Sequence, residues 1–177
     1  MNNKESLESI QNLKNQIDNK FKEAISHIDE NFKFNCIEFS ETEISKIEKI
    51  SNVIYYIEIS NSEDFQYEIF LNKFKEFKES NKHIKLPQIN IENKSKILYV
   101  GKSSTNFKTR INCHFRDTSL STYSIHYKTW SKNEYLKNLN FKLYYFQFKK
   151  PIDKDVLEII ETAFHNKFNP LLGRSGH

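Results

Sequence analysis

The sequence is poor in cysteine, glycine and proline: its 177 residues include two cysteines, three glycines and three prolines. Cys36 and Cys113 are too few for a disulfide framework and lack a CxxC spacing, which argues against structural zinc and redox chemistry, so we expect two small buried hydrophobes. No apolar run approaches the roughly 20 residues of a membrane-spanning helix, and the N-terminus shows no apolar signal segment. We therefore expect a soluble, cytoplasmic protein of one domain, without membrane contact.

Arginine is also scarce, because only three of the 27 basic residues are arginines, namely Arg110, Arg116 and Arg174. The charge is unevenly placed: residues 97–150 hold 10 basic and 2 acidic side chains, whereas the whole chain has a net charge of only +4. A segment this basic is typical of proteins that bind a phosphate backbone. On charge alone, a solvated lysine-rich surface explains it equally well.

Apolar and β-branched residues recur with periods that predict both helices and strands. Residues 5–29 read as an amphipathic helix with an acidic outer face, expected to pack on the main domain or to contact a second copy. Strands are expected at 52–60, 96–101 and 141–148. Helices are expected at 63–80, 104–115 and 153–167, the last beginning at the capping residue Asp153.

Gly101 and Lys102 follow an expected strand, as the last glycine and the lysine of a phosphate-binding P-loop do. That motif needs another glycine five positions earlier, where this chain has Lys96, and residues 97–100 read as strand rather than loop. We therefore reject a P-loop.

Polar residues interrupt the apolar stripes of two expected helices. Arg110 and His114 lie one turn apart along or beside one stripe, and Glu161 lies at the edge of the other. Buried polar groups need partners or a purpose. The structural explanations are a satisfied core histidine and a salt bridge between Glu161 and Arg110. The functional one is a phosphodiesterase in which the glutamate binds Mg²⁺.

These residues, taken in order, resemble the GIY-YIG nuclease superfamily. The shared elements are VIY at 53–55, YVG at 99–101 with Lys102 after it, Arg110 with His114, and Glu161 nine residues before Pro170. The resemblance covers about residues 51–173, and the Arg-x-x-x-His spacing is most similar to that of the family's type II restriction enzymes.

Three positions depart from the family pattern. Val53 stands in place of the motif's glycine, and Gly173 stands where an asparagine that braces the fold is expected, with Asn169 nearby. Tyr55 and Tyr99 are 44 residues apart rather than joined by a short hairpin, so residues 58–96 are expected to be an insertion with its own helix.

The resemblance implies an α+β fold with a small three-stranded antiparallel sheet flanked by helices. That domain would occupy residues 51–177, with residues 1–50 as an N-terminal helical extension packed on it. The implied activity is that of a DNA endonuclease, of restriction or phage-defence type, which hydrolyses phosphodiester bonds with one Mg²⁺ or Mn²⁺ ion.

Catalytic roles follow from the resemblance position by position. Glu161 would hold the metal and Arg110 would neutralise the scissile phosphate. Tyr55 or Tyr99 would help to deprotonate the attacking water, with Lys102 as the cation that favours the phenolate. His114 would orient this network or contact phosphate.

DNA contacts are expected from the active-site cations and from the basic segment after them, in which Trp130 also lies. The DNA-binding candidates are Lys102, Arg110, Arg116, His126 and Lys128. The insertion could also read bases. A homodimer is possible, and a restriction enzyme would have a cognate methyltransferase. Two alternatives remain: a nuclease-like module that binds nucleic acid without cutting it, and a purely structural role for all these residues.

Overall fold

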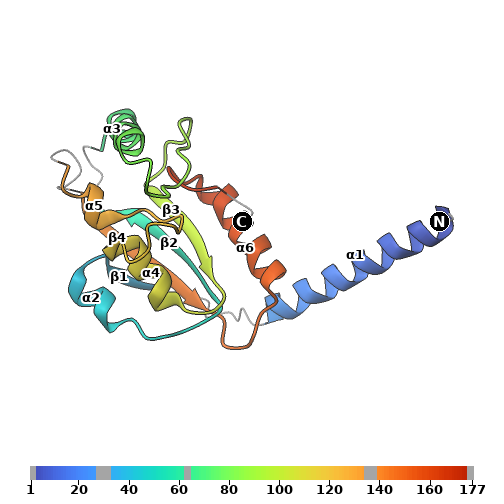
Figure 1. Ribbon diagram of the computed structural model, residues 1–177. Coiled ribbons are helices and arrows are strands. Elements are labelled where there is room, and N and C mark those ends of the chain that lie inside the picture. Colours follow the sequence, from blue (N-terminus) through green and yellow to red (C-terminus); the bar gives the residue numbers. More distant parts are fainter. Residues whose placement is uncertain (1–2, 27–32, 62–64, 134–138, 175–177) are drawn as a thin grey trace.

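The computed structural model describes residues 3–26, 33–61, 65–133 and 139–174. Within them, four strands form one antiparallel sheet in the order β1-β4-β2-β3 (Figure 1). The strands are β1 (Asn35–Glu38), β2 (Val53–Ile59), β3 (Ile97–Ser103) and β4 (Phe141–Gln147). The helices are α1 (Asn3–Ser26), α2 (Glu41–Lys46), α3 (Tyr67–Ser80), α4 (Phe107–Arg116), α5 (Tyr127–Trp130) and α6 (Lys154–Phe168).

The α+β class and all six expected elements of the main domain are confirmed, but the sheet has a fourth strand. β1 pairs with β4, from Asn35 opposite Tyr145 to Glu38 opposite Lys142. It is short and mostly exposed, so it lacks the alternation of apolar and polar residues that marks a half-buried strand. As a result, the main sheet begins within the segment that was expected to be only a helical extension.

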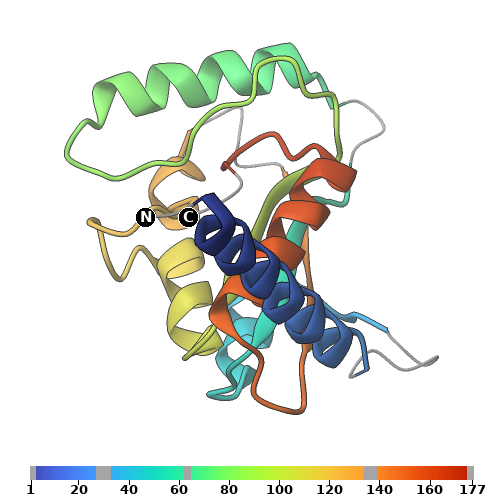
Figure 2. The same ribbon diagram turned by 90° about the vertical axis from the view of Figure 1, so that its right-hand side faces the viewer.

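The two faces of the sheet carry different cores because the side chains of β2 alternate between them. Ile54 points to one face, where it packs with Leu157 of α6 and Phe148. Tyr55 points to the other face, into the larger core that contains Phe107 of α4 and Trp130 of α5. The sheet is therefore covered by α6 on one side and by α4 and α5 on the other (Figures 1 and 2).

The segment between β2 and β3 carries α3, as the long spacing between Tyr55 and Tyr99 predicts. α3 begins four residues later than expected, at Tyr67. It lies across one end of the domain (Figure 2), where Phe70 and Phe74 pack edge-on against Trp130. The insertion is thus fixed to the core by aromatic contacts.

α1 projects away from the rest of the molecule (Figure 1). Its apolar side chains are exposed, at 68% for Leu7, 65% for Ile10 and 56% for Leu13. The expected packing is found only towards its C-terminal end, where the helix contacts α6 and Lys20 pairs with Asp153 at 2.7 Å. In the described part of the chain, no helix combines the length and apolarity that crossing a membrane requires.

Candidate active site

The two tyrosines of the resemblance lie side by side on adjacent strands. Tyr55 on β2 is paired with Gly101 on β3, and Tyr99 points to the same face of the sheet two residues earlier, with the two rings stacked at 6.3 Å between centroids. A Cβ atom at Gly101 would stand 2.5 Å from the Tyr55 hydroxyl oxygen. Glycine at this position therefore lets the Tyr55 ring lie across β3, at the edge of the sheet.

Arg110 joins the two hydroxyl groups. α4 begins at the capping residue Asn106, whose side chain accepts from the Thr109 amide, and it presents Arg110 to the sheet one turn later. The Arg110 Nε donates to the Tyr55 hydroxyl and its Nη2 donates to the Tyr99 hydroxyl, both at 3.0 Å. The polar residue on the apolar stripe is therefore explained by a contact with the tyrosines.

His114 holds the Tyr55 hydroxyl from the other side. Its Nδ1 accepts the Ile125 backbone N–H at 3.2 Å, and its Nε2 lies 2.8 Å from the Tyr55 oxygen. Burial, together with the charge of Arg110, holds the pKa of His114 well below its usual value. The neutral ring consequently carries its proton on Nε2 and donates it to Tyr55.

Burial raises the pKa of Tyr55 and of Tyr99, and the Arg110 charge opposes that rise for both. Arg110 is the cation that contacts both tyrosine hydroxyls. Lys102 pairs with the carboxylates of α6, and its positive charge also opposes the rise in the pKa of Tyr99.

Glu161 lies at the edge of the buried stripe of α6, as predicted, but its ion-pair partner is Lys102. The Lys102 Nζ lies 3.1 Å from Glu161 Oε2 and 3.1 Å from Glu158 Oε2. Burial raises the pKa of Glu161 despite the opposing charge of Lys102. The sequence places Glu158 on the polar face of the helix and gives no sign of its contact with Lys102.

This carboxylate fits a divalent metal. Mg²⁺ binds through one or two carboxylates together with substrate phosphates and water. Glu161 is buried beside Glu158, so two carboxylates lie together next to the Lys102 ammonium. Among the described residues, no group of three or more His, Cys, Asp or Glu side chains could hold a metal by itself.

A cavity of about 740 Å³ brings these groups together at the edge of β3. Its walls include Tyr99, Lys102, Arg110 and Glu161. The insertion contributes Lys78 to the wall and the C-terminal segment contributes Arg174, neither of which was predicted as a site residue. Tyr55 and His114 lie behind the wall, fully buried.

Residues 170–173 close one side of the cavity. Gly173 has a φ of +100°, and a Cβ there would lie 3.0 Å from the Tyr99 ring, so the glycine in place of the family's asparagine suits the local packing. The Asn90 side chain, from the insertion, donates to the carbonyls of Pro170 and Gly173 at 2.9 Å. Asn90 therefore braces this segment, whereas Asn169 caps α6.

The other DNA-binding candidates lie outside the cavity. Arg116 pairs with Glu41 at 2.6 Å, and Lys128 is exposed on α5. His126 is fully buried, with Nε2 on the Thr122 carbonyl and Nδ1 3.6 Å from Asp117, so it is not placed to contact DNA. Trp130 belongs to the core.

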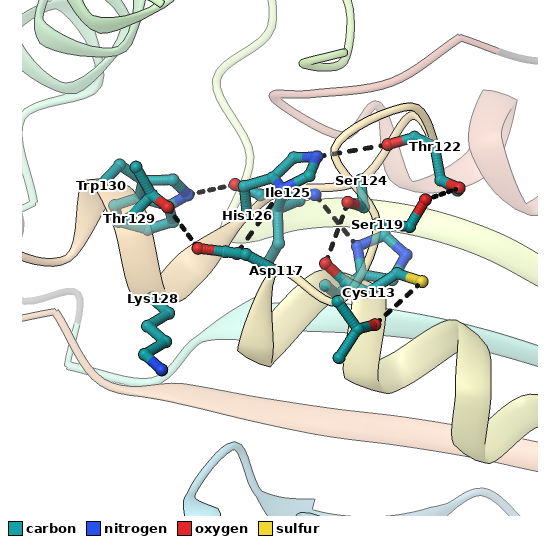
Figure 3. Close-up of polar contacts among 12 residues, drawn as sticks. Cys113, Asp117, Ser119, Thr122, Ser124, Ile125, His126, Lys128, Thr129 and Trp130 are labelled. Atoms are coloured by element: carbon teal, nitrogen blue, oxygen red, sulfur yellow. Dashed lines mark hydrogen bonds and ion pairs between the residues drawn. The ribbon is translucent and has the colours of Figure 1, made fainter. Parts of the chain in front are cut away.

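Figure 3 shows what the buried polar groups of residues 117–130 do instead. The Thr129 hydroxyl donates to Asp117, and the Trp130 indole donates to the Ile125 carbonyl. The Ser124 hydroxyl donates to the Cys113 carbonyl at 3.0 Å. These bonds fix the position of Ile125, whose amide orients His114. Cys113 is buried as expected, whereas Cys36 is exposed.

One comparison with known proteins gives a family match. Residues 65–128 match the family model of the GIY-YIG catalytic domain. The matched segment contains Tyr99, Lys102, Arg110 and His114, and it lies between Tyr55 and Glu161 in the chain. No curated protein and no solved structure matches the chain.

Proposed function

We propose that the chain is a DNA endonuclease of the GIY-YIG family, whose nucleases generally depend on a divalent metal, on the basis of the match at residues 65–128. The reaction is hydrolysis of a phosphodiester: water attacks the phosphorus, the bond from phosphorus to the leaving oxygen breaks, and that oxygen takes up a proton. The observation that carries the proposal is that Arg110 donates hydrogen bonds to both tyrosine hydroxyls and lines a cavity that also contains the Lys102–Glu161 pair.

Arg110 is assigned to the scissile phosphate. It lines the cavity, and its guanidinium is held rigidly by two hydroxyl groups, so it needs little reorganisation to face a developing negative charge. Tyr55 and His114 are assigned to positioning, because they lie behind the cavity wall and fix Arg110.

Tyr99 is assigned to the attacking water. Of the two tyrosines it is the one that lines the cavity, and its hydroxyl accepts an Arg110 N–H that stabilises negative charge on the oxygen. Tyr55 remains the alternative, and comparing Tyr55→Phe with Tyr99→Phe separates the two.

Glu161 is assigned to the metal, Mg²⁺ or Mn²⁺. When bound, such an ion supplies positive charge to the phosphate oxygens and a site for an activated water. Lys102, the ion-pair partner of Glu161, opposes the rise in pKa that burial causes and so favours the charged carboxylate that a metal needs.

A restriction or phage-defence role is the biological setting that we infer, with DNA as the substrate and a cognate methyltransferase in the restriction case. A second copy of the chain is the expected partner, because the apolar stripe of α1 includes three residues that are each more than half exposed, namely Leu7, Ile10 and Leu13. Enzymes that cut both strands commonly work as dimers, which agrees with such a stripe.

Cleavage of supercoiled plasmid and of long linear DNA tests the proposal, with Mg²⁺, with Mn²⁺ and with EDTA. We expect discrete metal-dependent fragments that vanish in Glu161→Ala and persist in Glu76→Ala, an exposed glutamate of α3 that pairs with Lys73. A smear or nicking would indicate an endonuclease without sequence specificity. DNA that is shifted in a gel but never cut would instead identify a binding module without catalysis.

A further inference from the structure

A second cavity adjoins the active-site cavity. It has a volume of about 580 Å³, and it shares Lys78, Leu86 and Tyr123 with the first. Its remaining basic lining consists of Lys75, Lys82 and Lys85, all from the insertion. The two cavities therefore lie next to each other, the first at the proposed catalytic groups and the second along α3 and the loop after it.

The combined lining of the two cavities is strongly basic. Four cations and one glutamate line the active-site cavity, and four lysines and one glutamate line the second, with Lys78 common to both. Lys75, Lys82 and Lys85 are exposed, so their ammonium groups are accessible to a ligand in solution. A predominantly basic cleft beside the proposed nuclease site is complementary to a polyanion.

The wall of the second cavity is built from two segments that hold each other. The Lys85 amide donates to the Leu120 carbonyl at 2.9 Å, and the Ser124 amide donates to the Lys85 carbonyl at 3.4 Å. On the α3 side, Lys78 Nζ donates to the Pro87 carbonyl at 2.8 Å. The backbone that carries Lys85 is thus anchored to the same loop that orients His114.

Tyr123 lies where the two cavities meet. Tyr123 is 59% exposed, although the next residue in its loop is fixed by the hydrogen bond from the Ser124 hydroxyl to the Cys113 carbonyl. The Lys85 ammonium lies 5.6 Å from the centre of its ring, a cation–π contact that holds this charge at the junction.

We propose that three lysines of the second cavity, Lys75, Lys82 and Lys85, bind the phosphates of the DNA strand that continues from the scissile phosphate. These three side chains are called here the lysine trough. Tyr123 positions the Lys85 ammonium at the entrance. This inference rests on the proposed function for the identity of the ligand, but it assigns a separate site, outside the catalytic groups, which the insertion supplies.

The test is DNA binding by the full chain in EDTA, measured by fluorescence anisotropy with a labelled 30-base-pair duplex at several NaCl concentrations. The variant is the triple Lys75→Gln, Lys82→Gln, Lys85→Gln. The control is the triple Lys73→Gln, Lys149→Gln, Lys150→Gln, which removes the same charge at positions that line neither cavity. Circular dichroism checks that both triples fold.

We expect the trough variant to bind roughly tenfold more weakly at moderate salt and the control to bind within twofold of the parent. The slope of log K against log salt should fall by about 0.9 for each phosphate contact removed, hence by about two to three in the trough variant. Tyr123→Ala should weaken binding more than Tyr123→Lys, because both variants remove the ring that holds Lys85 but only the lysine adds a positive charge at the junction.

Equal losses in the two triples, or no loss in the trough variant, would overturn the lysine trough. So would an RNA duplex that depends on these lysines more than DNA does. Plasmid cleavage by the unsubstituted chain is scored separately, so cutting without a role for the lysines would reject this inference alone. Lysine-dependent binding without cutting would reject the endonuclease and keep the trough.

Discussion

The active site and helix α1 depart from ordinary folding preferences in opposite directions. The site buries polar and charged groups, among them His114 and Glu161, which cost free energy unless each finds a partner. α1 leaves large apolar side chains in water, where the roughly 25 cal/mol gained per Å² of buried apolar surface is lost. Stability alone favours neither arrangement.

The difference between them is whether the partner lies within the chain. Arg110 meets two tyrosine hydroxyls, His114 meets Tyr55 and a backbone amide, and Glu161 meets Lys102. The stripe of α1 has no comparable cover towards its N-terminal end in the described structure. The polar groups of the site therefore have partners within the chain, whereas the apolar stripe of α1 is left to a partner that we propose to be a second copy.

The largest expected effect comes from Arg110→Ala. Removing the guanidinium takes away the positive charge that we propose faces the scissile phosphate, and it leaves both tyrosine hydroxyls without their shared donor. We expect a loss of at least about 10²- to 10³-fold in the rate of plasmid cleavage, measured in single turnover.

Arg116→Ala is the matched control, because it removes the same group from the same helix but from an ion pair with Glu41 outside the cavity. Its cleavage rate should stay within a few-fold of the parent. Equal rates in the two variants would remove Arg110 from the active site.

The next effect concerns the close packing of the polar site. In Gly101→Ala, the new methyl group would meet the Tyr55 hydroxyl at 2.5 Å and the Tyr99 ring at 2.9 Å, so both tyrosines must move. We expect cleavage to fall by tenfold or more, and overpacking to cost about 1–3 kcal/mol of unfolding free energy. Chemical denaturation and a cleavage time course measure the two effects. An unchanged cleavage rate would show that the tyrosine positions are not critical.

The sequence predicted the polar site better than it predicted the surroundings. Arg110, His114 and Glu161 could be identified because a polar residue on an apolar helical stripe is visible from spacing alone. Their partners were harder to assign. Glu161 forms its ion pair with Lys102 rather than with Arg110, because Glu161 and Arg110 approach the edge strand β3 from opposite faces of the sheet. Pairings of this kind depend on strand register, which spacing within one helix does not contain.

The errors elsewhere have the same origin. β1 was missed because an edge strand with one partner needs little apolar surface, and His126 was read as a DNA contact because a basic segment says nothing about burial. The packing of α1 on the domain is seen at its C-terminal end and stays a prediction elsewhere, because an apolar stripe predicts a covered face but does not state which molecule covers it. Sequence patterns thus indicated which residues are unusual, and the fold determined what each contacts.

A smaller effect should appear in the pH dependence of stability. The pKa of His114 is lowered in the folded protein by burial, whereas in the unfolded chain it is about 6.5. Below that pH the unfolded chain binds a proton that the folded ring does not, so the free energy of unfolding falls as the pH drops. The loss is at most about 1.4 kcal/mol per pH unit.

Thermal denaturation between pH 7.5 and 5.5 measures this effect as a difference between variants. His114→Gln should lose less stability over that interval than the parent, while His83→Gln, at an exposed position, should follow the parent curve. Other groups titrate in the same interval, and taking the difference removes their contribution. Identical slopes for all three proteins would mean that His114 is not held neutral.

The double variant Ile10→Gln, Leu13→Gln in α1 should have the smallest effect on stability. It nevertheless tests whether the apolar stripe of α1 is covered by a second molecule. Both side chains are more than half exposed, so the free energy of unfolding of one chain should change by less than about 0.5 kcal/mol. Sedimentation velocity should show a dimer of the parent that the variant cannot form. Leu120→Gln, which also removes an exposed apolar side chain, should leave the dimer intact. A parent protein that stays monomeric, together with a clearly destabilised variant, would mean that the stripe of α1 packs on its own domain. The contrast drawn here between the polar site and α1 would then be wrong.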